Sequence, residues 1–349
     1  MRIAVQGVGA VGGFGCGAEA LALALARGAT PAGTLDVATE RGPVTIAALR
    51  ADAAPLDRFV PRRNQRRMDS FTRMTALAAY LALEDAGALA DDHGRLGVVV
   101  ASGYGATGTT MALIDSIIEG GDVCTSPIHF AGSLHNGPAS NLAILLGAKG
   151  PSLTVSQFQL SAPSALMAAR LWLEAGRVDR VLFGAVDELS ELVAYLQARR
   201  GELEAPPGPS GPVGEGAAFC LLSTRPEARE PYCTLAQAVT GASPAPAAAA
   251  GLVLLSGEDL ADPDPGARRL TALYGATPAA PAFDLAAAAI LLRQGGECPA
   301  AFRDARGEAP ASITCLTRTD HGGFGLARVE RARGSVNSRP ISPLPKDLG

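Results

Sequence analysis

One strand-to-helix turn carries the residue types best placed for chemistry. It runs Ser156-Gln157-Phe158-Gln159-Leu160-Ser161, between a β-prone stretch at 152–156 and a helical stretch at 161–175. A side chain held at such a turn points at the positive N-terminal end of the helix dipole, and such turns commonly seat nucleophiles. Gln159, however, is a neutral amide that donates and accepts hydrogen bonds but forms no covalent acyl intermediate. The turn therefore has the shape of a catalytic site and lacks a nucleophile.

Ser161 is the hydroxyl nearest to this turn. The spacing of the sequence assigns it no His or Asp partner, and a serine at the start of a helix commonly caps it. We expect a capping role for Ser161.

A glycine run near residue 10 is a second candidate site. Gly7-Val8-Gly9-Ala10-Val11-Gly12 follows an expected strand at 2–6 and precedes an expected helix at 19–27, and Asp36 lies 24 residues beyond Gly12. This pattern formally satisfies the dinucleotide-binding fingerprint and favours an NAD-dependent oxidoreductase. Further glycines after Gly12 delay the helix whose N-terminus must meet the pyrophosphate, which weakens that hypothesis.

Composition narrows the class of protein. The 349 residues are 48% hydrophobic and 18% charged, as expected of a folded globular chain of one large or two similar units. A net charge of −4 and an aromatic content of 5% argue against nucleic-acid binding. The longest uncharged apolar runs, 285–292 and 247–255, are far shorter than the roughly 20 residues that span a bilayer.

Two further negative expectations follow from the residue types. Glycines between 7 and 17 would break the apolar region of a signal peptide, so we expect a cytoplasmic protein with no membrane span. The six cysteines are scattered without a C-x-x-C pair or a neighbouring His. We therefore expect reduced, mostly buried thiols, no disulfide framework and no metal site.

The periodicity of the chain alternates between strands and helices. Apolar residues recur at helical spacing over 68–87 and again over 111–118, and 96–101 and 180–186 are short apolar runs typical of buried strands. This alternation predicts a layered α/β fold. Loops are expected at 205–214 and 242–250, and an unstructured tail at 334–349.

Residues 1 to about 225 resemble the β-ketoacyl synthase branch of the thiolase-fold superfamily. The resemblance rests on four segments in order, namely Ile3 to Gly15, Arg67 to Gly87, Gly147 to Ser156, and Ala175 to Gly184. It implies a thiolase-like α/β fold of two pseudo-duplicated βαβ halves in an α-β-α-β-α layering. The expected division is a ketosynthase-like N-terminal half at 1–225, a shortened C-terminal half at 226–333 and the tail at 334–349.

The same resemblance places Gln159 where the family has its active Cys, counting back from Gly176. Family members with Gln at this position are the chain-length factors of type II polyketide synthases and the decarboxylating loading ketosynthases of modular ones. Condensation and decarboxylation in the family use two His from the second half, with a Lys nearby, to stabilise negative charge.

Those catalytic groups are not found in this sequence. The second half has only His321, within a loop that resembles the Gly-rich loop closing the family's active site, and the only lysines are Lys149 and Lys346. The resemblance therefore implies no catalytic residue in this chain.

The segment from Ser126 to Asn136 resembles synthase-like proteins of aryl-polyene and related highly reducing pathways. His135 and Asn136 within it are weak pocket candidates, with hydrogen bonding to the backbone as the alternative role.

We expect a non-catalytic chain-length-factor subunit that needs no cofactor and forms a heterodimer with a catalytic ketosynthase around a shared elongation tunnel. The candidate wall and interface residues are Gly108, Met111, Ala112, Ile114, Ile118, Phe158 and Gln159, with ordinary core packing as the alternative for the helix among them. The alternatives in function are a malonyl-carrier-protein decarboxylase that uses Gln159 and the NAD-dependent oxidoreductase.

One basic cluster, Arg58 to Arg67, contains five arginines. It suits the acidic surface of an acyl carrier protein as a transient partner, or else is the solvated start of a helix.

Overall fold

The computed structural model describes residues 2–121, 125–203, 211–225, 229–242, 251–257, 266–304 and 306–332. The expected tail at 334–349 and most of the expected loops at 205–214 and 242–250 lie outside the described residues.

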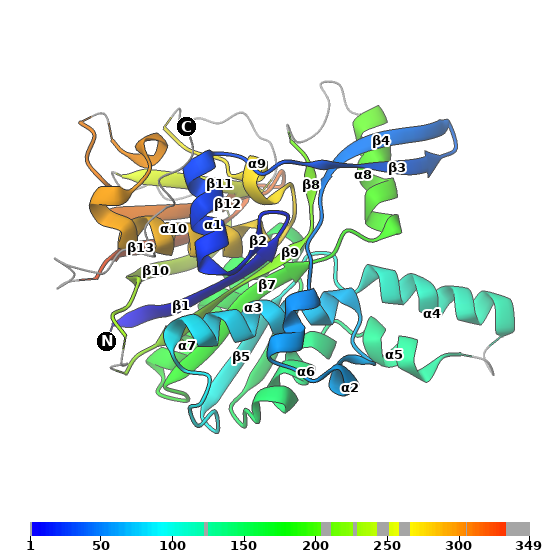
Figure 1. Ribbon diagram of the computed structural model, residues 1–349, viewed down its shortest axis with the longest axis horizontal. Coiled ribbons are helices and arrows are strands. Elements are labelled where there is room, and N and C mark those ends of the chain that lie inside the picture. Colours follow the sequence, from blue (N-terminus) through cyan, green and yellow to red (C-terminus); the bar gives the residue numbers. More distant parts are fainter. Residues whose placement is uncertain are drawn as a thin grey trace.

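One large sheet runs through the molecule (Figure 1). Its strands from the first half of the chain are β1 (Ile3–Gly12), β5 (Leu96–Ala101), β6 (Ser152–Val155), β7 (Arg180–Asp187) and β9 (Gly216–Ser223). They lie in the order β6-β5-β7-β9-β1, in which β6, β5 and β7 are parallel and the other neighbours antiparallel. β6 is the edge of this half.

The second half repeats this pattern with one strand fewer among the described residues. Its strands are β10 (Cys233–Ala242), β11 (Leu252–Gly257), β12 (Ser312–Arg318) and β13 (Gly323–Arg331). Their order β11-β12-β13-β10 and their directions match those of β5-β7-β9-β1, and β10 pairs with β1 to join the halves. The counterpart of β6 is reduced to an isolated parallel bridge between Leu254 and Arg268.

The long helix α3 (Ser70–Ala86) covers β1, β9 and β7 on one face of the first half. The Asp69 carboxylate caps it by accepting a hydrogen bond from the Thr72 amide at 2.8 Å, and Gly87 ends it in the left-handed conformation. Its boundaries confirm the helix expected at 68–87.

The glycines of the NAD fingerprint lie within a strand, because β1 continues to Gly12. A Cβ atom at Gly7 would lie 2.2 Å from the Ala82 carbonyl oxygen of α3, and one at Gly9 would lie 2.0 Å from that of Ala78. These glycines let the backbones of β1 and α3 approach closely. The expectation of a phosphate-binding turn at Gly7–Gly12 is therefore wrong, since the backbone there pairs with β9.

Two helices form the middle layer. α7 (Ser161–Glu174) packs on β5 and β7 and also on β10, while α10 (Ala280–Gln294) packs on β11 and β12 and also on β9 and β1. Because both halves of the sheet fold over it, α10 is buried from Ala280 to Leu292. Each middle helix precedes the strand of its own half, β7 or β12, that pairs in parallel with β5 or β11, which supports the pseudo-duplication.

Several smaller elements surround these layers. They are β2 (Gly15–Cys16), α1 (Gly17–Arg27), η1 (Ala54–Arg58), α2 (Arg62–Gln65), α6 (Gly137–Leu146), η3 (Phe158–Leu160), α9 (Thr271–Tyr274), η4 (Gly295–Glu297) and η5 (Ala300–Phe302).

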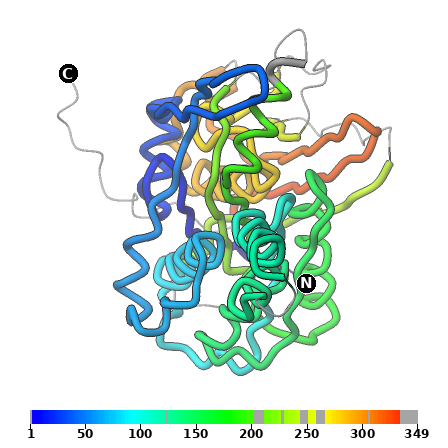
Figure 2. Tube along the Cα trace, turned by 90° about the vertical axis from the view of Figure 1, so that its right-hand side faces the viewer, coloured from blue at the N-terminus to red at the C-terminus, as the bar shows by residue number. Residues whose placement is uncertain are grey.

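Two projections extend from the first half (Figures 1 and 2). One consists of α4 (Thr107–Gly120) and α5 (Pro127–Ser133), which pack against each other. The other consists of α8 (Glu191–Leu203) with the sheet of β3 (Gly33–Thr39), β4 (Gly42–Leu49) and β8 (Val213–Gly214). No helix within the described ranges is long and apolar enough to span a membrane.

The described cysteines are free thiols. Cys220, Cys233, Cys298 and Cys315 are buried and Cys16 is partly buried, as expected, while Cys124 lies outside the described residues.

Candidate functional site

The turn between β6 and α7 is strained at one residue. Phe158 has a φ of 52°, and it is the only residue other than glycine with a positive φ among those described. Such a conformation costs about 1–3 kcal/mol for a side chain with a Cβ atom and is typical of functional turns. The next residue, Gln159, lies in the short helical turn η3, which leads directly into α7.

The Ser161 hydroxyl holds this turn closed. It accepts a hydrogen bond from the Gln157 amide at 2.8 Å and lies 2.7 Å from the Phe158 carbonyl oxygen and 3.0 Å from that of Ser102. The side chain is buried and bonds the residues before α7, not the amides within it. The expected capping role is therefore wrong in detail, because the hydroxyl stabilises the turn instead.

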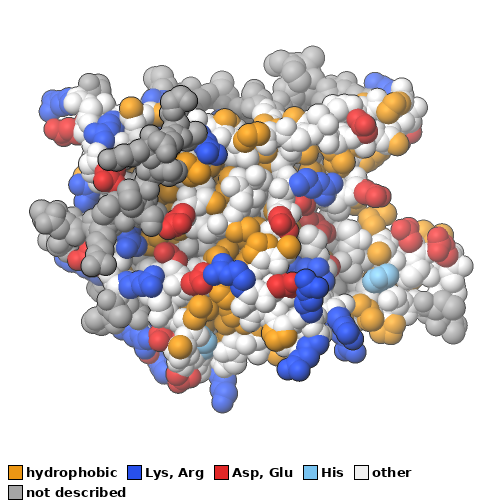
Figure 3. Space-filling view, viewed as in Figure 1, with side chains coloured by type: hydrophobic (Ala, Val, Ile, Leu, Met, Phe, Trp, Pro, Cys, Tyr) orange, Lys and Arg blue, Asp and Glu red, His pale blue; other side chains and the backbone are white. Residues whose placement is uncertain are grey.

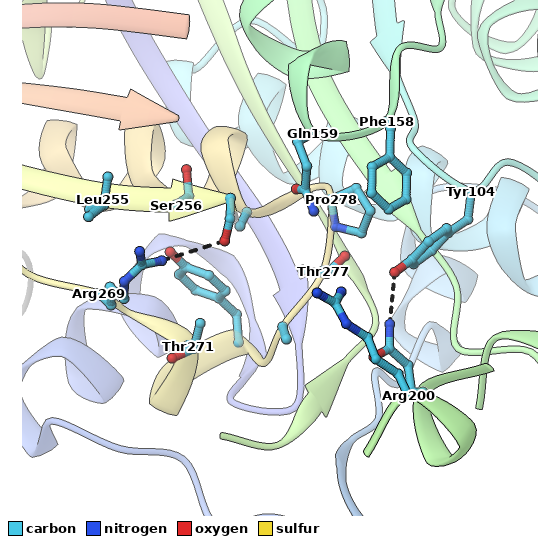
Figure 4. Close-up of a pocket in the computed structure, with 15 residues that line it drawn as sticks. Tyr104, Phe158, Gln159, Arg200, Leu255, Ser256, Arg269, Thr271, Thr277 and Pro278 are labelled. Atoms are coloured by element: carbon cyan, nitrogen blue, oxygen red, sulfur yellow. Dashed lines mark hydrogen bonds between the residues drawn. The ribbon is translucent and has the colours of Figure 1, made fainter. Parts of the chain in front are cut away.

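A cavity of about 170 Å³ lies beside the turn, between the two halves of the chain (Figure 4). Its polar lining side chains are Tyr104, Gln159, Gln197, Arg200, Ser256, Thr271, Tyr274, Arg269 and Thr277. The described lining includes two guanidinium groups and no Cys, His, Lys, Asp or Glu. It therefore offers no thiol nucleophile and no imidazole base.

Gln159 projects from the start of α7 to the cavity wall (Figure 4). Its Oε1 atom is buried and has no hydrogen-bond partner in the described part of the chain. A buried amide oxygen without a partner is costly, so this atom is suited to accept a hydrogen bond from a group that enters the cavity.

The second half supplies the opposite wall. Ser256, at the end of β11, lies 3.1 Å from the Thr317 hydroxyl, and the Arg269 guanidinium donates to the Gly257 carbonyl oxygen at 3.5 Å. Beneath them Asp284 accepts a hydrogen bond from the Tyr274 hydroxyl, and burial raises the pKa of Asp284 to about 6.

Buried carboxylates fix the loop that carries Tyr104. Asp187, at the end of β7, accepts hydrogen bonds from the Ser102 hydroxyl at 2.7 Å and the Tyr104 amide at 2.8 Å. Burial raises the pKa of Asp187 to about 6. Glu188 accepts from the Gly108 amide at 2.7 Å, and burial, together with nearby carboxylates, raises its pKa to about 7.

The helix expected to form a tunnel wall, α4, lies outside this cavity. None of its residues is buried, and the side chains of Ile114 and Ile118 are 41% and 75% exposed. Met111 and Ala112 are partly buried, and Gly108 is held by Glu188. The alternative role for this helix, packing within the core, is therefore wrong, because in this single chain α4 has no buried residue.

The remaining sequence candidates also lie away from the cavity. His135 and Asn136 are exposed before α6, where the His135 ring packs against the backbone of Gly105. His321 is 92% exposed and lies 3.6 Å from the Asp320 carboxylate. Its loop does reach the turn, since a Cβ atom at Gly323 would lie 3.1 Å from the Leu160 side chain.

Sequence reasoning missed most of the cavity wall. Tyr104 follows an expected strand and a Gly-rich loop, which is a usable signal. Gln197, Arg200 and Arg269 come from surface-like charged or polar segments and meet Gln159 only through the fold.

Comparison with known families decides the kinship of the chain. A profile of the β-ketoacyl synthase N-terminal domain matches residues 1–228. The chain belongs to the β-ketoacyl synthase family. Gln159 lies in the matched region, beside the cavity between the two halves of the chain.

Among curated relatives, the chain is 26% identical over 193 residues to 3-oxoacyl-[acyl-carrier-protein] synthase I of barley, Hordeum vulgare, a match covering 53% of this chain and 42% of the relative. Four curated relatives that it matches are covered over only 24–59% of their length.

Solved structures share the fold over nearly the whole chain. One is the ishigamide ketosynthase/chain length factor, with a TM-score of 0.71 and 18% identity, covering 95% of this chain and 99% of that one. Another is the ketosynthase ApeO in complex with its chain length factor ApeC from Xenorhabdus doucetiae, with a TM-score of 0.72, 17% identity and coverage of 95% and 98%. These likenesses confirm the expected thiolase-like α/β fold.

Proposed function

We propose that this chain is a non-catalytic subunit of the chain-length-factor type, which pairs with a catalytic ketosynthase and helps to enclose its growing product. The observation that carries the proposal is Gln159, an amide at a strained strand-to-helix turn beside a cavity whose described lining has no thiol and no imidazole. The turn keeps the geometry of a nucleophile site while the chemistry is lost.

Exposed apolar side chains support pairing with a partner. Among the described residues, large exposed hydrophobic side chains gather on α4, α5, α6, the turn and α7; this exposed apolar set is Ile114, Ile117, Ile118, Ile128, Phe130, Leu134, Ile144, Phe158 and Leu171. Apolar side chains are visible on the α4–α5 projection in Figure 3. An exposed area of this kind is typical of a surface that a partner covers.

The edge strand β6 lies between two members of this set. α6 carries Ile144, which is 80% exposed, and α7 carries Leu171, which is 59% exposed, and both helices pack against β6. An uncovered strand edge flanked by apolar side chains favours pairing with another chain. We infer that the ketosynthase binds here, as the neighbours' ketosynthase and chain length factor subunits suggest.

An acyl carrier protein is the second partner that we propose. Arg58 and Arg62 are paired with Glu84 and Asp57 at 2.8 and 2.7 Å. Arg63, Arg66 and Arg67 are exposed around α2. These three cations suit the acidic surface of a carrier protein, whose binding would be transient and weakened by salt.

A decarboxylase acting on a malonyl carrier protein is the second candidate function. The two guanidinium groups that line the Gln159 cavity, Arg200 and Arg269, are suited to bind a carboxylate. Release of carbon dioxide from malonyl carrier protein by the isolated chain, lost in Gln159→Leu, would favour this candidate.

The decisive experiment is co-expression with a ketosynthase that carries the active Cys, followed by sizing and native mass spectrometry. We expect a one-to-one complex whose condensation is abolished by replacing the partner's Cys. Gln159→Cys in this chain should not restore it, because the described lining of the cavity supplies no imidazole. A stable monomer that never co-purifies with a ketosynthase would contradict the proposal.

A further inference from the structure

Phe158 belongs both to the lining of the Gln159 cavity and to the exposed apolar set. Its side chain lines the cavity and is nevertheless 45% exposed. A Phe is an unfavourable choice for a φ of 52°, where glycine would fit without strain. The aromatic ring at this position is therefore accompanied by strain in the local backbone.

Tyr104 holds this ring in place. The two rings meet edge to face, with centroids 5.6 Å apart and planes at 62°. The Tyr104 hydroxyl accepts a hydrogen bond from the Gln197 side-chain amide of α8 at 3.0 Å (Figure 4). Three separate segments, the turn before α7, the loop before α4 and α8, thus converge on one aromatic pair.

The loop under Tyr104 has little freedom to move. A Cβ atom at Gly103 would lie 2.2 Å from the Pro278 side chain, so the backbone there packs tightly against the segment that leads into α10. The Gly103 and Tyr104 amides are also bound to the buried Asp187 carboxylate. Tyr104 is therefore held on a fixed backbone, while the side chain of Phe158 remains 45% exposed.

We propose that Phe158 is a gate between the Gln159 cavity and the surface on which the exposed apolar set lies, held closed by Tyr104 and Gln197, and that it determines whether an acyl chain enters the cavity. This inference rests on the proposed function, in which that set faces the growing chain. The cavity of about 170 Å³ has room for a group about the size of a benzene ring. Phe158, Tyr104 and Gln197 are then specificity-determining residues, not catalytic ones.

The first test measures access in the isolated chain and needs no partner. Gln159→Cys places a thiol behind the gate, and its alkylation by N-ethylmaleimide is followed by peptide mass spectrometry. We expect at least a tenfold faster reaction in Phe158→Gly/Gln159→Cys than in Gln159→Cys alone. Rates within twofold of each other would overturn the gate.

Two further variants serve as controls for this test. Tyr104→Phe combined with Gln159→Cys leaves the strained turn untouched and removes the hydroxyl that accepts the Gln197 bond, so a two- to threefold faster reaction is expected even if Phe158→Gly folds poorly. Leu89→Ala combined with Gln159→Cys truncates an exposed apolar side chain after α3 and should leave the rate unchanged.

The second test uses the complex with a ketosynthase and measures product length. Phe158→Gly should give a larger share of longer products, whereas Leu89→Ala should not. Unchanged products from a complex whose cavity has become accessible would overturn the specificity role of the gate. If the unmodified chain forms no complex, the proposed function fails, and the alkylation rates alone then decide whether the gate exists.

Discussion

The two halves of this chain share a strand pattern but differ at their edges. The first half ends in a complete strand, β6, flanked by the exposed side chains of Ile144 and Leu171. The sheet order of the second half ends at β11, whose outer side is bridged at Arg268 alone among the described residues. All the described large hydrophobic side chains that are exposed lie between residues 89 and 196, in the first half. Among the described residues, exposed apolar surface is thus concentrated in the first half, which is the surface that the proposed function assigns to assembly.

The turns that precede the two middle helices differ in the same way. Before α7 the chain is strained at Phe158 and clamped by Ser161, whereas the counterpart before α10 runs through Thr277 and Pro278 without a positive φ. Strain of this kind is typical of functional turns, and here it lies in the half that the family profile matches.

The largest effect on stability is expected in the first half, where the backbones of β1 and α3 are in close contact. Gly9→Ala places a Cβ atom 2.0 Å from the Ala78 carbonyl oxygen of α3, and neither backbone can yield easily. We expect a loss of about 3 kcal/mol in the free energy of unfolding, at the upper end for overpacking. Urea denaturation measures it. Gly296→Ala in the second half meets no atom within 4 Å and should be nearly neutral.

Assembly tests the difference between the edges directly. Ile144→Asp combined with Leu171→Asp should weaken binding to the ketosynthase by roughly 100-fold, or about 2.7 kcal/mol, because a charge would be desolvated in an apolar contact. The melting temperature of the isolated chain should not change, since both side chains are exposed. Leu89→Asp is the matched control. Full binding by the double variant, measured by calorimetry, would place the interface elsewhere.

The pH dependence of the free energy of unfolding should report the burial of the Glu188 carboxylate in the first half. Burial raises the pKa of Glu188 from 4.5 to about 7, so the folded state holds this proton more tightly than the unfolded state. The free energy of unfolding therefore falls as pH rises from about 4.5 to 7. Glu188→Gln should reduce the fall between pH 5 and pH 8 by about 2 kcal/mol. Glu308→Gln, at an exposed site of the second half, should leave the curve unchanged.

The smallest expected effect concerns the carrier protein. Replacing Arg63, Arg66 and Arg67 with Ala should weaken carrier binding about tenfold at low salt, or about 1.4 kcal/mol, and less at high salt. Fluorescence anisotropy with a labelled carrier protein measures this. Replacing Arg268 and Arg306, two exposed arginines of the second half, with Ala should have no effect. An equal loss per removed charge in both variants would indicate general attraction between the two proteins.

The sequence predicted the elements of the first half well. α3 has its apolar face and its glycine stop, and β5 was expected at 96–101, where it occurs. The glycines of β1 misled because a close strand-to-helix contact and a phosphate-binding turn require the same residue. The division of the chain at about 225 remains a prediction.

The cavity was much harder to predict. Phe158 and Gln159 lie at a recognisable turn, but Gln197 and Arg269 reach it from segments whose sequence resembles an ordinary surface. Their proximity depends on how the fold places α8 and the segment before α9, which no local pattern encodes. The exposure of α4 could not be predicted either, because a helix that packs in a core and one that forms an interface have the same spacing of apolar residues.

The position of β1 has a consequence for how the chain acquires its structure during synthesis. β1 ends at Gly12, yet apart from the two-residue strand β2 its neighbours in the sheet are β9, which begins at Gly216, and β10, which ends at Ala242. At a ribosomal rate of about 5–20 residues per second, this strand waits roughly 10–40 s for a partner. During that time its apolar side chains are open to chaperones or to aggregation. Slower translation should therefore lower the yield of soluble protein, and faster completion of the chain should raise it.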